Sequence, residues 1–300
     1  MSKNQKLELP KAGALESSCE AEKNDRHRKR IEMILNISKE LGFPVGKEMS
    51  ILDLGCGYGK YVYLLRKMGF NAFGVEIDDD KHPLYKSSWL KILSDLKEEH
   101  IVSEESEVIR LVKKGQEYRI PFQDATFDFV YSDQVFEHVR DYERTIFEIF
   151  RVLKSGGFSL HIFPSRYRIN ECHTSIPFAT VFRGWKYLRF WAFVGITSES
   201  TRGLSWEETA RWNFNYLNEQ TNYLPKTKLR EYFCKAFGDV SFAEGAFVKF
   251  HPRIPHYVYE TASATRMLPL VSWVVSVFAT RVVWVRKDRG LKHASSLANA

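Results

Sequence analysis

The sequence predicts an α/β fold: a doubly wound, mostly parallel sheet of seven strands, with an aromatic-rich insertion after the fifth strand. The first observation is that short apolar runs alternate with segments of helical periodicity from residue 50 to residue 163. The second is a glycine-rich turn, Gly55 to Gly59, that joins the first apolar run to a helix. The strand–helix–strand unit at 50–76 is short, which implies parallel neighbouring strands.

The individual elements follow from periodicity and from the residues that interrupt it. Apolar residues recur at helical spacing after Asp25, and Gly42 and Pro44 end that helix. Gly156 and Gly157 are expected to close a later helix. Helices are predicted at 25–41, 60–68, 84–96, 142–153 and 225–237. Strands are predicted at 50–54, 72–76, 108–112, 127–132, 158–163, 240–242 and 281–285.

Three further segments complete the predicted organisation. Residues 1–24 and 288–300 are polar or of mixed charge, so we expect mobile tails on either side of one domain at 25–287. Residues 164–223 break the alternation, and we expect them to form a substrate-side insertion over the ligand edge of the sheet. The apolar run 268–279 is short for a membrane span, so a buried or membrane-surface helix is favoured.

Charge and cysteine content restrict the class of protein. The net charge of +7 is made up of +3 in residues 1–30 and +4 in residues 281–300, so the middle of the chain is neutral. This distribution disfavours a nucleic-acid partner. Four cysteines without a Cys-x-x-Cys pattern indicate neither a zinc site nor a disulfide framework. The amino terminus lacks an apolar signal region, so we expect a cytoplasmic protein, with peripheral contact at the inner face of a membrane as the alternative.

The stretch Ile51–Gly59 is the first candidate binding site, because ligands bind at the carboxyl ends of strands in open α/β sheets. A phosphate-binding loop is excluded, since Lys60 is followed by Tyr61 and the glycine spacing is wrong. A dinucleotide fingerprint is also a poor match, because its third glycine falls elsewhere. The turn therefore indicates a nucleotide-like ligand of another kind.

The pattern Gly55-x-Gly57-x-Gly59 resembles the first motif of the class I S-adenosylmethionine-dependent methyltransferases, of the type 11 kind. Four more segments fall in that family's order. They are Glu76 at the end of the second strand, the loop 115–122, the strand 127–132 with 135–139 after it, and Leu153–Phe158. The resemblance covers roughly residues 48–165 and implies a Rossmann-like sheet with S-adenosyl-L-methionine as cofactor.

The resemblance also implies a set of cofactor-binding residues. Glu76 is expected to accept hydrogen bonds from both ribose hydroxyls, as a carboxylate is able to do. Asp53 is expected to organise the glycine turn and the methionine amino group, although a capping role is the plain alternative. Gln116 stands where the family often has Asp facing the adenine. The full predicted set is Asp53, Gly55, Cys56, Gly57, Gly59, Glu76, Ile77, Gln116 and Ser132. Cys56 is expected to pack rather than react.

The insertion supplies the catalytic candidates. Glu171-Cys-His173, followed by Pro177-Phe178, resembles a segment of methyltransferases of bacterial cell-surface glycan or glycolipid pathways. His173 is a candidate base for an acceptor hydroxyl, because its ordinary pKa lies near neutrality. Glu171 is expected to orient it or to bind substrate. A loop histidine bonded for stability is the alternative. His138 is expected to pack or cap locally, and no metal is expected.

The functional hypothesis is methyl transfer to a small-molecule acceptor, a hydroxyl of a sugar-like or lipid-linked substrate. The net +4 of residues 164–196 suits a phosphorylated or glycolipid-like acceptor. Two alternatives stay open. One keeps the cofactor but uses a quinone, a sterol-like lipid or a nitrogen nucleophile. The other is a non-enzymatic, membrane-associated protein on the same fold. The sequence does not predict an oligomeric state.

Overall fold

The computed structural model describes residues 12–78, 83–103, 108–113 and 118–288. In these residues seven strands form one sheet in the order β3-β2-β1-β4-β5-β7-β6. The strands are β1 (Ser50–Leu54), β2 (Asn71–Asp78), β3 (Ile109–Lys113), β4 (Phe127–Asp133), β5 (Leu153–Pro164), β6 (Ser241–Phe242) and β7 (Thr280–Arg286). The first five run parallel, and β7 is antiparallel to both neighbours. The predicted fold is confirmed.

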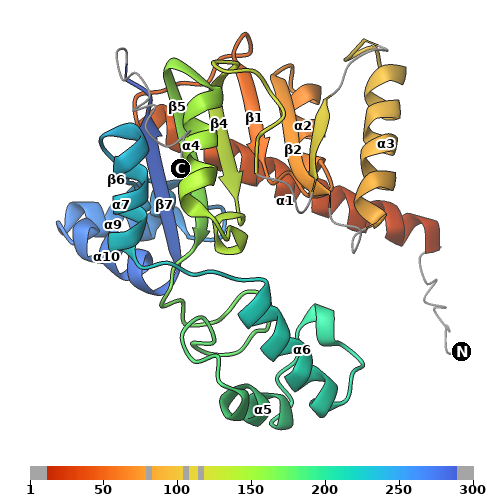
Figure 1. Cartoon of the computed structure of the whole chain (residues 1–300), viewed down its shortest axis with the longest axis vertical. Coiled ribbons are helices and arrows are strands. Elements are labelled where there is room, and N and C mark those ends of the chain that lie inside the picture. The colour runs from red at the N-terminus through yellow and green to blue at the C-terminus, as the bar shows by residue number, and fades with distance from the viewer. Residues whose placement is uncertain (1–11, 79–82, 104–107, 114–117, 289–300) are drawn as a thin grey trace, which may run out of the picture.

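Helices cover both faces of this sheet (Figure 1). One face packs against α1 (Ala12–Glu40), α2 (Lys60–Lys67), α3 (Pro83–Glu98) and α8 (Glu244–Phe250). The other packs against α4 (Tyr142–Val152) and α7 (Lys226–Phe237). Successive residues of β1 show why, since Ile51 joins one core and Leu52 the other. Strands buried on both sides are expected to be apolar throughout, as β1 and β4 largely are.

The order in which strands are added to the sheet changes side between β1 and β4. After β1 it builds β2 and β3 on one side, and it then returns to add β4 on the other side. The carboxyl ends of β1 and β4 therefore lie next to each other, with the register Asp53↔Tyr131. In open α/β sheets such a switch point leaves the crevice in which ligands bind.

Two predicted boundaries are wrong. The helix expected from Asp25 begins at Ala12, so residues 12–24 are helical rather than part of a tail. Gly156 and Gly157 do not close a helix, because α4 ends at Val152 and β5 begins directly at Leu153. The Gly156 amide donates to the Lys287 carbonyl at 2.6 Å, and the Lys287 amide donates to the Gly157 carbonyl at 2.9 Å. These glycines are thus part of the sheet.

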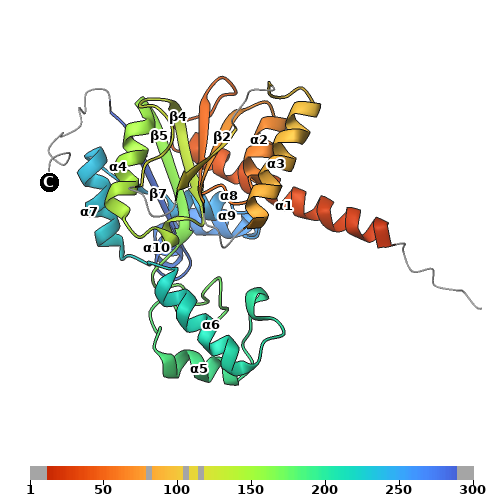
Figure 2. The ribbon, with the colours of Figure 1, turned by 45° about the vertical axis from the view of Figure 1, so that its right-hand side comes forward.

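The insertion forms a small helical lobe beyond the carboxyl end of β5 (Figures 1 and 2). It holds α5 (Trp185–Phe193), the 3-10 turn η2 (Glu199–Thr201) and α6 (Trp206–Glu219). The lobe has a core of its own, in which Ile176, Leu188 and Leu217 are fully buried. It therefore adds a separate packed unit at the edge where the candidate ligand site lies.

The apolar run 268–279 forms α10 (Leu268–Phe278), which follows α9 (His256–Ala264). This helix is not buried throughout, because Leu270, Trp273 and Val274 are exposed. Within the described parts of the chain, no helix combines the length and the apolar character needed to cross a bilayer. Arg281, at the start of β7, is buried and paired with Glu244 at 3.3 Å.

Candidate active site

The glycine turn after β1 has the backbone that its sequence predicts. Gly55, Gly57 and Gly59 all have positive φ, at 73°, 52° and 77°, which L side chains rarely adopt. At Gly55 space is also limiting, because a Cβ there would lie 2.5 Å from a methyl carbon of Val135. At Gly57 no atom of the described residues lies within 4 Å of the position of a Cβ, so that side of the turn is open to a ligand.

Glu76 lies near the end of β2 and reaches across to this turn. Its Oε2 accepts a hydrogen bond from the Gly57 amide at 2.6 Å, and its Oε1 accepts from the Ile77 amide at 2.9 Å. The Ile77 side chain is 44% exposed. A carboxylate and an exposed apolar side chain thus border the open side of the turn, which suits a ligand with hydroxyls and an aromatic base.

Asp53 fits a cofactor with a positively charged group. Its side chain is buried, and its Oδ2 has no hydrogen-bond partner among the described residues. Burial raises the pKa of this carboxyl well above its usual value. Cys56 is also buried, and its sulfur packs so closely on Gly74 that a Cβ there would lie 2.7 Å away. Burial raises the pKa of the Cys56 thiol, which agrees with a packing role.

Ser132, another predicted cofactor residue, has its hydroxyl inside the sheet. The Ser132 hydroxyl is buried in the sheet and hydrogen-bonded to His161 Nδ1 at 2.8 Å, so it faces the interior. The other ring nitrogen of His161 lies 2.7 Å from the Ser159 hydroxyl. Burial lowers the pKa of His161 to about 3, so the ring is neutral. Gln116 lies outside the described residues.

A buried ion pair at the end of β4 was not predicted. The Asp133 carboxylate accepts hydrogen bonds from Arg30 Nε at 2.7 Å and Nη2 at 2.6 Å, in a bidentate arrangement. It also accepts from the Tyr61 hydroxyl at 3.3 Å. Arg30 belongs to the part of α1 that packs on the sheet, so this contact attaches α1 to the candidate site. The sequence signal is faint, since an arginine on a charged helix resembles a surface residue.

Glu171 holds the loop that carries His173. Its fully buried carboxylate accepts from the amides of His173 and Thr174, at 2.8 and 2.7 Å, and from the Thr174 hydroxyl at 2.9 Å. The Tyr223 hydroxyl donates to the other oxygen at 2.7 Å. Its bonds go to the loop backbone and to Tyr223, an arrangement that suits the expected role of orienting His173. It is a positioning residue.

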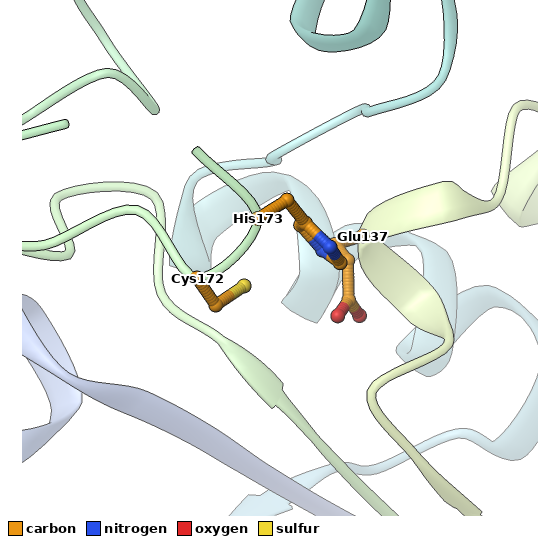
Figure 3. A group of neighbouring side chains, drawn as sticks. All are labelled: Glu137, Cys172 and His173. Atoms are coloured by element: carbon orange, nitrogen blue, oxygen red, sulfur yellow. The ribbon is translucent and has the colours of Figure 1, made fainter. Parts of the chain in front are cut away.

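His173 comes to lie opposite Glu137, a residue that the sequence prediction missed (Figure 3). Glu137 belongs to the 3-10 turn η1 (Phe136–His138) that follows β4. It is fully buried, and neither carboxylate oxygen has a hydrogen-bond partner among the described residues. Burial raises the pKa of Glu137 to about 8. The buried Nε2 of His173 is also without a partner, and burial lowers the pKa of that ring.

His138 borders the same group. Its Nδ1 lies 2.8 Å from the Gln220 carbonyl oxygen, and its Nε2 lies 4.0 Å from Glu137 Oε1. The rings of His138 and His173 meet edge to face, with their centroids 5.0 Å apart. The predicted local role of His138 fits the bond to Gln220. Burial lowers the pKa of His138, which favours a neutral ring.

Hydrogen bonds join the end of the lobe to the segment after β4. The Asn222 amide donates to the Glu137 carbonyl at 2.6 Å, and the Asn222 side chain donates to the Val139 carbonyl at 3.0 Å. Arg140 donates to the Glu219 carbonyl. On its outer side the lobe carries exposed aromatic residues, of which Phe193 is 69% exposed. The lobe therefore borders the group formed by Glu137, His138 and His173.

The geometry of the glycine turn agrees with what comparison with known proteins shows. The family described as the methyltransferase domain matches residues 52–160. An uncharacterized methyltransferase of Schizosaccharomyces pombe is 28% identical over 188 residues, which are 56% of this chain and 66% of that protein. A sarcosine/dimethylglycine N-methyltransferase of Halorhodospira halochloris is 28% identical over 134 residues, 44% of this chain and 42% of that protein.

A sterol 24-C-methyltransferase of Schizosaccharomyces pombe is 32% identical over 108 residues, 36% of this chain and 25% of that protein. The chain thus spans 66% or less of the length of these relatives. Among solved structures, a phosphoethanolamine N-methyltransferase of Haemonchus contortus is 15% identical, with 84% of this chain and 51% of that chain covered and a TM-score of 0.43. Residues 52–160 thus match a methyltransferase family, and the sheet order and the glycine turn of this chain agree with that match.

Proposed function

We propose that this protein transfers a methyl group from S-adenosylmethionine to a hydroxyl of a sugar-like or lipid-linked small molecule. The observation that supports this acceptor side is the pair of Glu137 and His173: both carboxylate oxygens of Glu137 and Nε2 of His173 are buried and have no hydrogen-bond partner among the described residues. Val135, two residues before Glu137, contacts the turn at Gly55. A polar acceptor group would therefore be received beside the cofactor.

In this proposal the turn and its neighbours hold the cofactor. Glu76 accepts the ribose hydroxyls, the open backbone at Gly57 lets the ligand approach, and Asp53 Oδ2 accepts from the amino group. When bound, S-adenosylmethionine supplies a methyl group on a positively charged sulfur, which leaves as a neutral thioether. The protein contributes position and the exclusion of water.

On the acceptor side, His173 is the proposed contact for the hydroxyl. Its pKa is lowered by burial, so at neutral pH the ring is unprotonated and able to take the hydroxyl proton. Glu171 fixes the backbone on both sides of the His173 peptide, which sets where the ring lies. The exposed aromatic residues and the basic charge of the lobe suit sugar faces and phosphate groups.

Cofactor binding is tested by calorimetry with S-adenosylmethionine on the wild type and on Glu76→Gln. Glu76→Gln removes the charge of a carboxylate that accepts hydrogen bonds from two hydroxyls. We expect it to weaken cofactor binding about 10- to 150-fold, which corresponds to a loss of about 1.5–3 kcal/mol in binding free energy. Glu260→Gln, an exposed residue of α9, is the matched control and is expected to bind as the wild type does. A wild-type protein that does not bind S-adenosylmethionine would refute the proposal.

The acceptor is tested by transfer of a labelled methyl group from S-adenosylmethionine into fractionated cell extract, with glycolipid fractions first. Label in a methyl ether supports the hydroxyl acceptor. Label on nitrogen or on a sterol carbon would instead favour the kinds of substrate for which two of the relatives are named. His173→Ala is expected to lower turnover about 10²- to 10⁴-fold with cofactor affinity unchanged, because an alcohol needs its proton removed.

Peripheral membrane contact belongs to the same proposal. On α10, Trp273 is 57% exposed, and Leu270 and Val274 are exposed near it. Aromatic and aliphatic side chains of this kind favour the boundary between headgroups and acyl chains. Sedimentation with anionic vesicles at low salt is the expected result, and Trp273→Ser is expected to reduce it. Wild-type protein that stays in the supernatant would refute the contact.

A further inference from the structure

We propose that Glu137, Cys172 and His173 form a binding site for a divalent transition-metal ion of the zinc type, next to the cofactor turn. One ligand atom from each of these side chains lies within 4.8 Å of the others. Figure 3 shows Cys172 and His173 extending from one loop toward Glu137 on the turn after β4. The site deepens the proposed function and rests on it for its role in the reaction.

The first argument is that the donor atoms of Glu137 and His173 are otherwise unused, whereas the Cys172 sulfur lies 3.7 Å from Glu171 Oε1 and 4.0 Å from the Tyr223 hydroxyl. Both oxygens of Glu137 and Nε2 of His173 are buried without a hydrogen-bond partner among the described residues. A buried polar atom that makes no bond costs about 1–3 kcal/mol, and a carboxylate costs more. Three such atoms, aimed into one small space from two segments, therefore indicate a ligand that accepts electron pairs from all of them.

The second argument comes from His138. Because the Gln220 carbonyl oxygen can only accept, Nδ1 of His138 carries the proton of the neutral ring, and Nε2 presents a lone pair. His138 Nε2 lies 4.0 Å from Glu137 Oε1, so this lone pair borders the same group of donor atoms. Histidines whose second nitrogen is bonded to a carbonyl are common around metal sites.

The third argument is the chemistry of the donor set. Thiolate, imidazole and carboxylate together are typical of zinc, whereas magnesium and calcium take oxygen ligands. Bonds of about 2.0–2.3 Å in a tetrahedron separate the ligand atoms by about 3.4–3.7 Å. The group therefore has to contract by about 1 Å, which side-chain rotation supplies. Cys172 is exposed, so an ion reaches the site from solvent.

A zinc ion with three protein ligands keeps a fourth position for an oxygen of water or alcohol. Coordination lowers the pKa of that hydroxyl. The hydroxyl proton then passes to bulk water, and the oxygen forms its bond to the methyl carbon while the carbon–sulfur bond breaks and leaves its electrons on sulfur. His173 acts here as a ligand instead of a free base.

The site is tested on the full chain after removal of metal with a chelator. Calorimetry with Zn²⁺ is expected to show one equivalent bound, and Glu137→Gln and His173→Ala are each expected to weaken it at least 10-fold. With Co²⁺ the wild type is expected to show a thiolate charge-transfer band. Cys172→Ser is expected to abolish that band, whereas Cys234→Ser, a half-buried cysteine of α7, is expected to keep it.

Binding of S-adenosylmethionine by the Glu137→Gln and His173→Ala variants serves as the readout of folding. Wild type that binds S-adenosylmethionine but neither metal overturns the site and leaves the proposed function intact. Wild type that binds Zn²⁺ but no S-adenosylmethionine supports the site and overturns the proposed function. Unchanged Zn²⁺ binding in Glu137→Gln, or a cobalt band that persists in Cys172→Ser, overturns the assignment of the ligands.

Discussion

Replacing Glu171 by glutamine tests whether this residue shapes the active site from within the protein. The carboxylate receives four hydrogen bonds from N–H and O–H donors, namely two amides, the Thr174 hydroxyl and the Tyr223 hydroxyl, and a longer one from the Cys172 thiol at 3.7 Å. A bond to a charged acceptor contributes about 1.5–3 kcal/mol, against about 0.5–1.5 kcal/mol for a neutral one. The loss is thus about 1 kcal/mol per bond, partly offset because a buried charge is removed. We expect Glu171→Gln to lower the free energy of unfolding by about 2–4 kcal/mol.

The measurement is urea unfolding of the full chain at pH 7, with Tyr223→Phe as the matched variant. Tyr223→Phe removes one of the four donors and is expected to cost about 1–2 kcal/mol. Both variants should keep their affinity for S-adenosylmethionine, because the hydrogen bonds that they change go neither to Glu76 nor to the glycine turn. Two results would refute the reasoning: a Glu171→Gln protein within about 0.5 kcal/mol of wild type, or a Tyr223→Phe protein that loses as much as Glu171→Gln.

The pH dependence gives an independent check on the same carboxylate. Burial pushes its pKa upward, but the charge of His173 and the hydrogen bonds from Tyr223 and Thr174 outweigh burial, so the folded pKa is below its ordinary value. A depressed carboxyl pKa contributes stability that is present above the unfolded pKa and is lost as pH falls toward the folded pKa. Wild type should therefore lose more stability than Glu171→Gln between neutral and acid pH.

Two further substitutions probe the sheet and its turn. Gly55→Ala is expected to lower Tm and weaken cofactor binding, because its Cβ would lie 2.5 Å from a methyl carbon of Val135. Gly57→Ala meets no atom of the described residues, so it costs only the strain of positive φ, about 1–2 kcal/mol. Equal melting temperatures of the two variants would contradict this reasoning. His161 has a folded pKa of about 3, below the ordinary 6.5, so its contribution is present above pH 6.5 and is lost toward pH 3. Between pH 6.5 and pH 4 wild type is expected to lose about 3 kcal/mol more than His161→Gln, and parallel pH curves would show that His161 is not the cause.

Much of the sheet could be predicted from the sequence because its strands are apolar and its turns are marked by glycine. The first strand was predicted at 50–54 and is β1, Ser50–Leu54. The boundary at β5 was wrong because Gly156 and Gly157 resemble a helix end locally, and only pairing with Lys287, far along the chain, makes them part of the sheet. The start of α1 was missed because Leu15 is the single large aliphatic residue in residues 12–24, which is too few for an apolar stripe.

Some residues of the candidate site could also be predicted from the sequence, and others could not. Glu76 was predictable, because a strand end next to a glycine turn is a local pattern. Glu137 was not, since its burial depends on the loop at 171–173, which is distant in sequence. Glu171 was expected to orient His173 or to bind substrate, and its bonds to the loop backbone are contacts within a short stretch of sequence. Its bond to Tyr223 is long-range, so no window of sequence contains it.

The lobe between β5 and α7 bears on how such an enzyme changes its acceptor over evolutionary time. Its core of Ile176, Leu188 and Leu217 is separate from the two cores that hold the sheet together. Substitutions in the core of the lobe are therefore expected to leave the packing around the sheet unchanged. We expect a different lobe to be able to replace it if that lobe also donates hydrogen bonds to the carbonyl groups of Glu137 and Val139. Under the proposed function, in which the lobe borders the acceptor, acceptor preference is an exchangeable module attached to a fixed methyl donor site.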